Sequence, residues 1–467
     1  MFSSLLFVPF VCADVPAELW SFSSNTTTNN VSWESGVVAD GVAYVWNTET
    51  YTIPGEQAHY ESMFPLTRSL GNIYALNAQN GAKLWNYTVT GDIRSFRVLD
   101  GVVYVSASEG LNIDGKYVGG GVYAWDAATG AQKWVYKIDG DIIRCSINNG
   151  TIYVFFHASG DYSSLLCAVN TTNGEELWRW NAGTYVFPSM FTIGNEAIYF
   201  AIGNQYYAIN TKDGTLLWST PVDGTVNWYS TLGDGVVYFS STKTTYALNA
   251  QNGNQLWTYP GASSSISNNG ILYKNADDFV YAYDGSKGNQ VWNYSANGRT
   301  ILSLSRIDNV IYFSSNGTLT ALNIADGTPL WSSSTDVNGT LSISDGSFRY
   351  YGFGAYASVN DGIFYYYSGK TLHALDAING DNLWNHTISN NQSFVTVADG
   401  IAFYSGNNSI HALSFPTVSH PSSSPTGAPN GASMNLVSFN LVLIIGSIVV
   451  VIVALLVIVF VRNRTRK

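Results

Sequence analysis

Charged residues are scarce in this chain. Only 11% of its 467 residues are Asp, Glu, Lys or Arg, whereas globular proteins average about a quarter. This composition excludes a charge-rich disordered chain, a coiled coil and a nucleic-acid-binding protein.

Cysteine is almost absent as well. Only Cys145 and Cys167 follow the first thirteen residues, so the chain is not a disulfide-stabilised scaffold.

Glycine and aromatic residues are abundant instead, with 44 Gly, 31 Tyr and 14 Trp. They predict many short strands joined by tight turns. Length alone would suggest about three domains. An internal repeat indicates one large domain instead.

The repeat is an eleven-residue pattern, Ala-x-(Asn/Asp)-x-x-x-Gly-x-x-x-Trp, which recurs eight times. A ninth copy, His411-Ala412-Leu413, lacks the Gly and the Trp, and Leu19-Trp20 supplies its second half from the other end of the chain. The eight copies are residues 75–85, 124–134, 168–178, 208–218, 247–257, 282–292, 321–331 and 374–384. The nine repeat tryptophans are Trp20, Trp85, Trp134, Trp178, Trp218, Trp257, Trp292, Trp331 and Trp384.

A turn and an apolar strand precede each copy. Asp40-Gly41, Asn149-Gly150 and Asp234-Gly235 each separate two apolar runs, which is the strongest short signal for a β-hairpin. Each unit of roughly forty residues is therefore expected to form four antiparallel strands, the period of a β-propeller.

The motif residues have physical roles in such a unit. Gly adopts the left-handed turn conformation, and the Asn or Asp caps that turn with its side chain. Ala leaves room that we expect a Trp from a neighbouring blade to fill. Leu19-Trp20 beside Ala412 would close the ring, which removes exposed sheet edges. The sequence thus predicts an all-β propeller closed by an N-terminal strand.

These residues resemble the tryptophan-docking repeat of the pyrroloquinoline-quinone (PQQ) family of propellers, over about residues 19–415. The resemblance implies the propeller fold. The family's enzymes typically have eight blades, whereas nine units are counted here, so we expect nine, with eight as the alternative. The family includes quinoprotein dehydrogenases that use PQQ with calcium, non-catalytic scaffolds of envelope assembly, and luminal sensing domains.

The dehydrogenases of this family typically carry a vicinal Cys-Cys disulfide, which this sequence lacks. No catalytic residue or metal ligand carries over from the family. We therefore expect no cofactor, and PQQ with calcium only under the enzyme alternative. Cys145 and Cys167 fall on the first and third strands of one unit. That places them roughly 9–10 Å apart, beyond the reach of about 7 Å for a disulfide, and predicts two free, buried thiols.

The C-terminal region predicts a membrane anchor. Residues 441–461 carry no charge, and Arg462, Arg464, Arg466 and Lys467 follow directly, a stop-transfer, positive-inside pattern. We expect one transmembrane helix over residues 436–461 and a basic cytoplasmic tail over 462–467. A buried core helix is the alternative. The Pro/Ser/Gly-rich segment 418–435 is expected to be a stalk.

The N-terminal residues 1–13 have the apolar run and cleavage-site residues of a signal peptide, with a frayed apolar terminus as the alternative. The propeller, residues 14–417, would then lie outside the cell or in a lumen, in a type I protein of the plasma membrane or an endomembrane. Removing the four basic tail residues from the 21 leaves 17 against 32 acidic residues, a net charge of −15. This charge disfavours nucleic acid as a partner. Eleven sequons permit N-glycosylation, at Asn25, Asn30, Asn86, Asn149, Asn170, Asn293, Asn316, Asn338, Asn385, Asn391 and Asn407.

Three units carry long insertions, residues 46–72, 106–121 and 332–356. The first two lie between the second and third expected strands, and the last lies between a Trp strand and the next inner strand. Both kinds of connection emerge on the same face of an antiparallel blade. The insertions are rich in aromatic residues, which suggests recognition of a partner. Tolerated loop decoration is the alternative.

The same face opens onto the central channel. The residues expected at its mouth are Trp33, Arg94, Arg144, Phe187, Trp228, Arg299 and Phe394. Arginines interleaved with aromatic residues would suit a small anionic or polar ligand. The alternative is a water-filled channel in which the arginines pair with Asp92 or Asp141.

The sequence therefore favours a single-pass membrane-anchored propeller that acts as a non-catalytic extracellular or luminal binding module. Its expected partners are the membrane, through one helix, and a protein, a glycan or a small anion on the face with the insertions. A membrane-anchored PQQ-dependent oxidoreductase is the alternative.

Overall fold

The computed structural model describes strands and turns throughout. The described residues are 17–24, 31–57, 65–109, 119–160, 163–261, 265–301, 304–335, 341–344, 355–360, 362–368, 370–387, 395–398, 400–406 and 408–414. All of them belong to the first of two compact units, Met1–Pro416 and Thr417–Lys467. Within these ranges no helix is long and apolar enough to cross a membrane, and the span predicted at 436–461 lies outside them.

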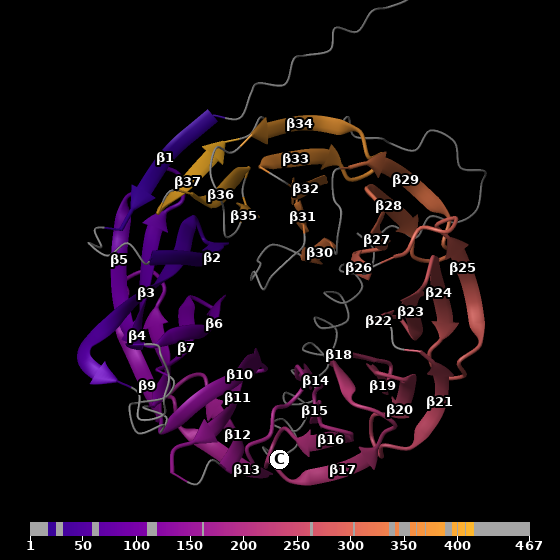
Figure 1. Ribbon diagram of the computed structural model, residues 1–467, viewed down its shortest axis with the longest axis horizontal. Helices are drawn as coiled ribbons and strands as arrows, with labels where there is room; N and C mark the ends of the chain where they lie inside the picture. The colour runs from indigo at the N-terminus through magenta and orange to yellow at the C-terminus, as the bar shows by residue number, and fades with distance from the viewer. Residues whose placement is uncertain are drawn as a thin grey trace, which may run out of the picture. The chain divides into compact units, whose positions relative to one another are not determined.

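The strands form nine sheets around a ring (Figure 1). In chain order the sheets are β2(Val31–Ala39), β3(Val42–Gln57), β4(Pro65–Asn77) and β5(Lys83–Thr90); β6(Asp92–Leu99), β7(Val102–Ser108), β8(Gly120–Asp126) and β9(Gln132–Ile138); β10(Gly140–Asn148), β11(Thr151–Ala158), β12(Ser163–Asn170) and β13(Glu176–Thr184); β14(Thr192–Ile193), β15(Ala197–Ile202), β16(Gln205–Asn210) and β17(Leu216–Pro221); β18(Val226–Gly233), β19(Val236–Ser241), β20(Thr244–Asn249) and β21(Gln255–Pro260); β22(Ser265–Asn268), β23(Ile271–Ala276), β24(Phe279–Asp284) and β25(Gln290–Ser295); β26(Leu304–Ile307), β27(Val310–Ser315), β28(Thr318–Asn323) and β29(Pro329–Ser334); β30(Leu341–Ser344), β31(Ala355–Asn360), β32(Ile363–Ser368), β33(Thr371–Asp376) and β34(Asn382–Thr387); and β35(Val395–Ala398), β36(Ile401–Gly406), β37(Ser409–Ser414) and β1(Ala17–Ser23).

Nine blades are confirmed, against the alternative of eight. Eight sheets have four strands, and one has five because β30 adds to β31 in parallel, which the sequence pattern did not predict. The expected hairpin turns are present. Asp40 and Gly41 have φ angles of 51° and 74°, and Asp234 and Gly235 have 47° and 77°. These left-handed pairs match the right-handed twist of the strands that they join.

The repeat motif joins each blade to the next. Trp218 packs on the turn glycine Gly253 of the following blade, where an added Cβ would lie 2.6 Å from the indole. Its Nε1 donates a hydrogen bond to the carbonyl of Ala250, at 3.0 Å. The motif alanine has a different role from the one expected. Ala208 lies opposite Trp218 in its own blade, so the docking surface for a neighbour's Trp is the Gly turn.

The N-terminal strand closes the ring as predicted. β1 pairs with β37, and Trp20 lies opposite Ala412. Trp20 packs on Gly81 of the first blade and donates from Nε1 to the carbonyl of Ala78 at 3.0 Å. His411 Nδ1 lies 3.0 Å from the Glu18 carboxylate, so β1 and β37 are joined by strand pairing, packing and a polar contact.

The antiparallel order gives every blade two distinct ends. One end, which we call the turn face, carries the Asp-Gly or Asn-Gly hairpins and the motif turns, such as residues 234–235 and 250–254. The other end, the insertion face, carries the connections between second and third strands and between successive blades. The first two predicted insertions therefore begin and end on one face. The third, where it is described, includes β30, which runs alongside β31.

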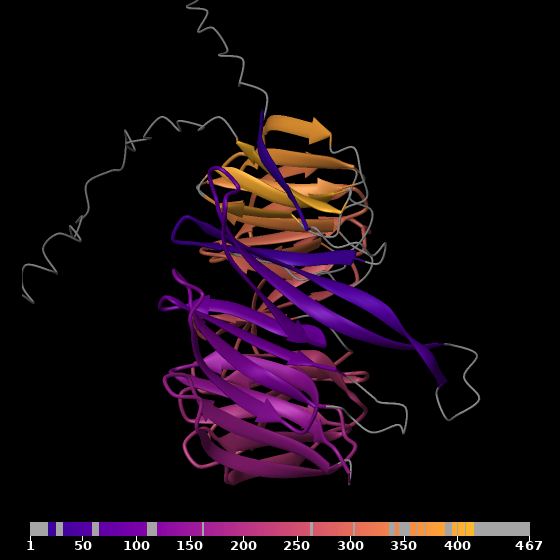
Figure 2. The same ribbon diagram turned by 90° about the vertical axis from the view of Figure 1, so that its left-hand side faces the viewer.

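The first insertion is largely strand, which corrects its reading as a loop. β3 is 16 residues long, against 6 in β19. Its register with β4 continues through Thr52 opposite Thr67 to Gln57 opposite Pro65. All residues of the run Thr48-Glu-Thr-Tyr-Thr-Ile53 except Glu49 are β-branched or aromatic, which favours an extended ribbon. Figure 2 shows this ribbon, in indigo, projecting beyond the blades.

The two cysteines occupy the strands predicted for them and are free. Cys145 on β10 and Cys167 on β12 both lie opposite Val154 on the strand between them. Cys167 is fully buried, and burial raises the pKa of its thiol to about 12. Cys145 is only partly buried, so the prediction of two buried thiols holds fully for Cys167.

Candidate functional site at the insertion face

Residues 50–57 of β3 and 65–69 of β4 form a two-stranded ribbon at the insertion face. β2 accompanies β3 only as far as Glu49, and β5 accompanies β4 only from Leu70. Beyond those residues, the strand pairing in the described part of the chain is between β3 and β4 alone. Both outer edges of the ribbon therefore present backbone donors and acceptors to solvent or to another strand.

Arg94 lies at a β-bulge on the inner strand β6, between Ile93 and Ser95. A bulge re-aims the side chain of the extra residue. The guanidinium donates from Nε to Ser108 Oγ at 3.2 Å and from Nη2 to Asp141 Oδ1 at 3.3 Å, and Asp92 lies 3.9 Å away. Arg94 thus makes the pairing with Asp92 and Asp141 that the water-filled-channel alternative expected.

Ser108 completes this network and was missed in the sequence. Its fully buried hydroxyl donates to Asp141 Oδ1 at 2.6 Å. Two carboxylates thus share one guanidinium, so the cluster of Arg94, Asp92 and Asp141 carries a net charge of −1. Such a cluster holds two neighbouring blades together and offers a cation or a hydrogen-bond donor more than an anion.

The other predicted mouth residues are dispersed rather than gathered. Trp33 on β2 is buried, at 3% exposure, with its ring 5.6 Å from that of Tyr74. Arg144 on β10 donates to the carbonyl of Ile143 at 3.0 Å. Arg299 is exposed and donates to Thr318 Oγ1 at 3.2 Å.

Phe187 belongs to a small aromatic group that the sequence did not reveal. It is 52% exposed and lies edge-on to His157, whose ring centroid is 4.8 Å away. The buried His157 is bonded through Nε2 to the carbonyl of Val186 at 3.0 Å. Trp228 lies on β18 within a register shift, and its side chain and Phe394 lie outside the described residues.

Lys274 on β23 is a buried cation that sequence reasoning also missed. It is only 4% exposed, and its Nζ lies 5.7 Å from the centroid of the Tyr259 ring. Burial lowers the pKa of its ammonium group. The aromatic ring replaces part of the lost hydration by a cation–π contact, and the site faces a blade seam rather than the channel.

The residues described do not fit a calcium–PQQ centre. Calcium takes six to eight oxygen ligands, and the described part of the chain holds no group of three or more His, Cys, Asp or Glu side chains placed to share a cation. At the mouth, the carboxylates of Asp92 and Asp141 are held around Arg94 instead. No chemical step is therefore assigned to PQQ.

Comparison with known structures finds matches at low sequence identity. BamB from Moraxella catarrhalis has 12% identity and a TM-score of 0.42, covering 86% of this chain and 100% of its own. A quinohemoprotein alcohol dehydrogenase, ADHIIG from Pseudomonas putida HK5, has 12% identity and a TM-score of 0.43, covering 91% and 80%. The computationally designed protein Ika8 has 14% identity and a TM-score of 0.48, covering 70% and 96%. Similarities this distant say nothing of function.

None of the curated proteins compared matches the chain in sequence. The family model described as outer membrane protein assembly factor BamB does match, three times, over residues 16–179, 162–271 and 263–422. Together these matches span the whole propeller and confirm the family that the repeat tryptophans indicated. The chain belongs to the PQQ-repeat β-propeller family whose model is described as outer membrane protein assembly factor BamB.

Proposed function

We propose that this protein is a membrane-anchored propeller that binds a protein partner outside the cytoplasm, through its insertion face. In this proposal residues 436–461 span the membrane and residues 418–435 hold the propeller away from it. The propeller is a binding module rather than a catalyst. The acidic charge of the chain and its eleven sequons are in keeping with an extracellular or luminal position.

The β3–β4 ribbon is the observation that carries the proposal. A two-stranded ribbon is marginally stable on its own, and its outer edges, as far as the chain is described, have no further strand beside them. An extended segment of a partner can add to such an edge by main-chain hydrogen bonds. Tyr51, 37% exposed on the ribbon, offers an aromatic contact beside that edge.

Shortening the ribbon tests the proposal. Tyr51 lies opposite Arg68, so replacing residues 52–67 by Asn-Gly leaves a two-residue hairpin turn in the same register. The experiment cross-links the intact chain, in its own membrane, to proteins on the non-cytoplasmic side. We expect the partners captured by the intact chain to be lost from this variant. Leu84→Ser, on an exposed outer-strand residue, is the control and should retain them. An unchanged set of partners in the shortened variant would rule the ribbon out.

The oxidoreductase alternative rests on family membership alone and has a separate test. The full chain is titrated with calcium and PQQ while absorbance and thermal unfolding are followed. A spectral shift with thermal stabilisation would replace the binding proposal by a redox one. Neither change is expected.

A further inference from the structure

Seven blade seams share one hydrogen-bond arrangement. The repeat Trp of one blade donates from Nε1 to the carbonyl of the residue that follows the motif Asn or Asp in the next blade. In three of these seams a Tyr of the second strand donates to the same carbonyl, as Tyr199 and Trp218 both do to Ala250. The seven pairs are Trp20–Ala78, Trp85–Ala127, Trp134–Thr171, Trp178–Thr211, Trp218–Ala250, Trp257–Gly285 and Trp331–Ala377, at 2.8–3.0 Å.

The seam between the sheets β22–β25 and β26–β29 lacks this arrangement. Among the described residues, neither Trp292 Nε1 nor the Tyr273 hydroxyl has a hydrogen-bond acceptor. The residue at the acceptor position is Ile324, where the other seven seams have Ala, Thr or Gly. Trp292 still packs on Gly327 as the repeat tryptophans of the seven other seams pack on their turn glycines. We attribute the missing hydrogen bond to the larger, branched side chain at the acceptor position.

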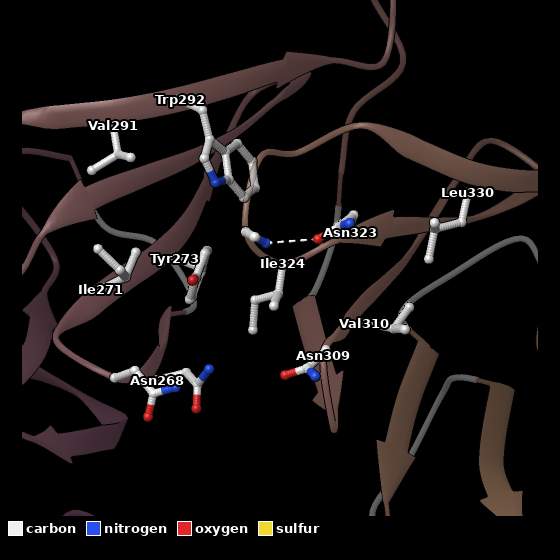
Figure 3. A pocket seen from close by; sticks show the side chains of 12 residues that line it. Asn268, Ile271, Tyr273, Val291, Trp292, Asn309, Val310, Asn323, Ile324 and Leu330 are labelled. Atoms are coloured by element: carbon white, nitrogen blue, oxygen red, sulfur yellow. Dashed lines mark hydrogen bonds between the residues drawn. The ribbon is translucent and has the colours of Figure 1, made fainter. Parts of the chain in front are cut away.

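A pocket of about 590 Å³, partly open to solvent, lies at this seam, and its volume is within the range of small-molecule sites. Figure 3 shows Trp292 and Tyr273 on one side, Asn309 and Leu330 on the other, and Ile324 between them. The pocket opens on the turn face, because its residues come from the hairpins and motif turns of the two blades. The proposed partner site on the insertion face is therefore separate from it.

The lining of this pocket is uncharged but rich in hydrogen-bonding groups. Asn268, Asn269, Asn309 and Asn323 contribute side-chain amides, each of which both donates and accepts. Asn323 Oδ1 accepts a hydrogen bond from the backbone N–H of Ala325 at 2.9 Å. Its Nδ2 group is the part of the amide that can donate to a ligand. Tyr273 is only 3% exposed, and burial raises the pKa of its hydroxyl to about 12, so it is a donor at neutral pH.

We propose that this pocket binds a neutral pyranose sugar. A sugar hydroxyl replaces the backbone carbonyl as the acceptor. It accepts hydrogen bonds from Trp292 Nε1 and from the Tyr273 hydroxyl. The asparagine amides pair with further hydroxyls, which likewise donate and accept. The apolar C–H face of the ring packs on aliphatic side chains such as Leu330 and Ile324.

The lining residues carry no charge. Arg306, whose charge acts on the Tyr273 hydroxyl, is not among them and donates to the carbonyl of Asp308. A charged sugar therefore finds no counter-ion in the lining itself, and its desolvation is poorly compensated.

The test is a titration of the full chain, kept in a detergent without a sugar headgroup. The probes are the methyl glycosides of glucose, galactose, mannose and N-acetylglucosamine, and binding is followed by calorimetry and ligand-observed NMR. At least one of these sugars is expected to bind and glucuronate is not. Asn309→Ala should weaken binding by about tenfold, the effect of one well-formed hydrogen bond, while Asn195→Ala, in the corresponding region of another blade, should leave it unchanged.

Ile324→Ala tests the role of this side chain in the seam. The variant gives the seam the residue found at four of the other seams, so we expect Trp292 to donate to the carbonyl as they do and sugar binding to be lost. Because Ile324 is buried, at 5% exposure, its truncation should also lower thermal stability, but by less than an uncompensated Ile→Ala change in a core does, since a hydrogen bond is gained. The proposal is overturned if none of the four sugars binds, if neutral peptide amides bind in their place, or if Ile324→Ala binds sugar as the natural chain does.

Discussion

At the scale of single residues, the fold depends on a tryptophan that meets a glycine of the next blade. Gly253 has a φ of 72°, and an added Cβ would approach the Trp218 ring to 2.6 Å. The glycine is therefore required twice, once by its left-handed backbone and once by the flat indole against it. The eight intact turn motifs repeat this requirement around the ring.

Gly253→Ala and Gly235→Ala separate the two requirements. Gly235 has a similar φ of 77° with nothing within 4 Å of an added Cβ, so its variant should lose only the backbone term of about 1–2 kcal/mol. Gly253→Ala should lose about 1–3 kcal/mol more, because the indole must move. Denaturant unfolding of both variants measures the difference. Equal losses would show that the indole contact contributes nothing to stability.

At the scale of elements, β1 is a strand separated from its partner by almost the whole ring. It completes the sheet of β35–β37 and carries Trp20 to the first blade. Trp20 is 9% exposed while its neighbour Leu19 is 43% exposed. The inward face of β1 therefore contributes the stabilisation, and its outward face does not.

Trp20→Ala is expected to reduce stability by about 3–5 kcal/mol, since a large buried ring and its hydrogen bond to Ala78 are lost. Leu19→Ala is the matched control and should stay within about 0.5 kcal/mol. Deleting Ala17–Ser23 altogether should lower the thermal midpoint at least as far as Trp20→Ala does. A deletion variant as stable as the natural chain would mean that the ring closes without β1.

At the scale of the whole molecule, buried tyrosines recur around the ring and titrate together. Burial raises the pKa of Tyr44, Tyr238 and Tyr312, on three different blades, to about 12. Their pKa in the unfolded chain is about 10. Below pH 10 both states are protonated and the stability is intact. As the pH rises through 10 the unfolded chain loses protons first, so stability falls until the pH passes the folded value.

The thermal midpoint is therefore expected to fall steadily from about pH 10 to about pH 12, the window between the two sets of pKa values. Measuring it together with tyrosinate absorbance tests the cause, since the buried tyrosines should ionise only as the ring unfolds. A flat midpoint with early tyrosinate formation would contradict the burial of these hydroxyls. Tyr238→Phe, which keeps the ring and removes the ionisable group, should reduce the slope.

The sequence predicted the ring well and the sites poorly, for physical reasons. Asp234-Gly235 and the Trp repeat are local constraints on backbone and packing, so their spacing predicts blades and closure. The arrangement of the channel-mouth residues depends on the orientation of each side chain, which local sequence does not determine. Neighbouring strands set the bulge at Arg94 and the burial of Trp33. One difference in the repeat could have indicated the unusual seam from the sequence alone. Ile324 occupies the position at which the other intact repeats have Ala, Thr or Gly.

The ring closure also has a consequence in time. Ser23 and Ser409 face each other across the closing sheet although 386 residues separate them in sequence. At about 5–20 residues per second of synthesis, the first strand emerges roughly 20–80 s before its partner exists. During that interval the earlier blades can assemble one upon another, while β1 waits unpaired and the first blade lacks its neighbour. β1 can therefore complete its sheet only after β37 has been synthesised. In a chain interrupted before β37, the ring cannot close and its first and last blades lack a neighbour.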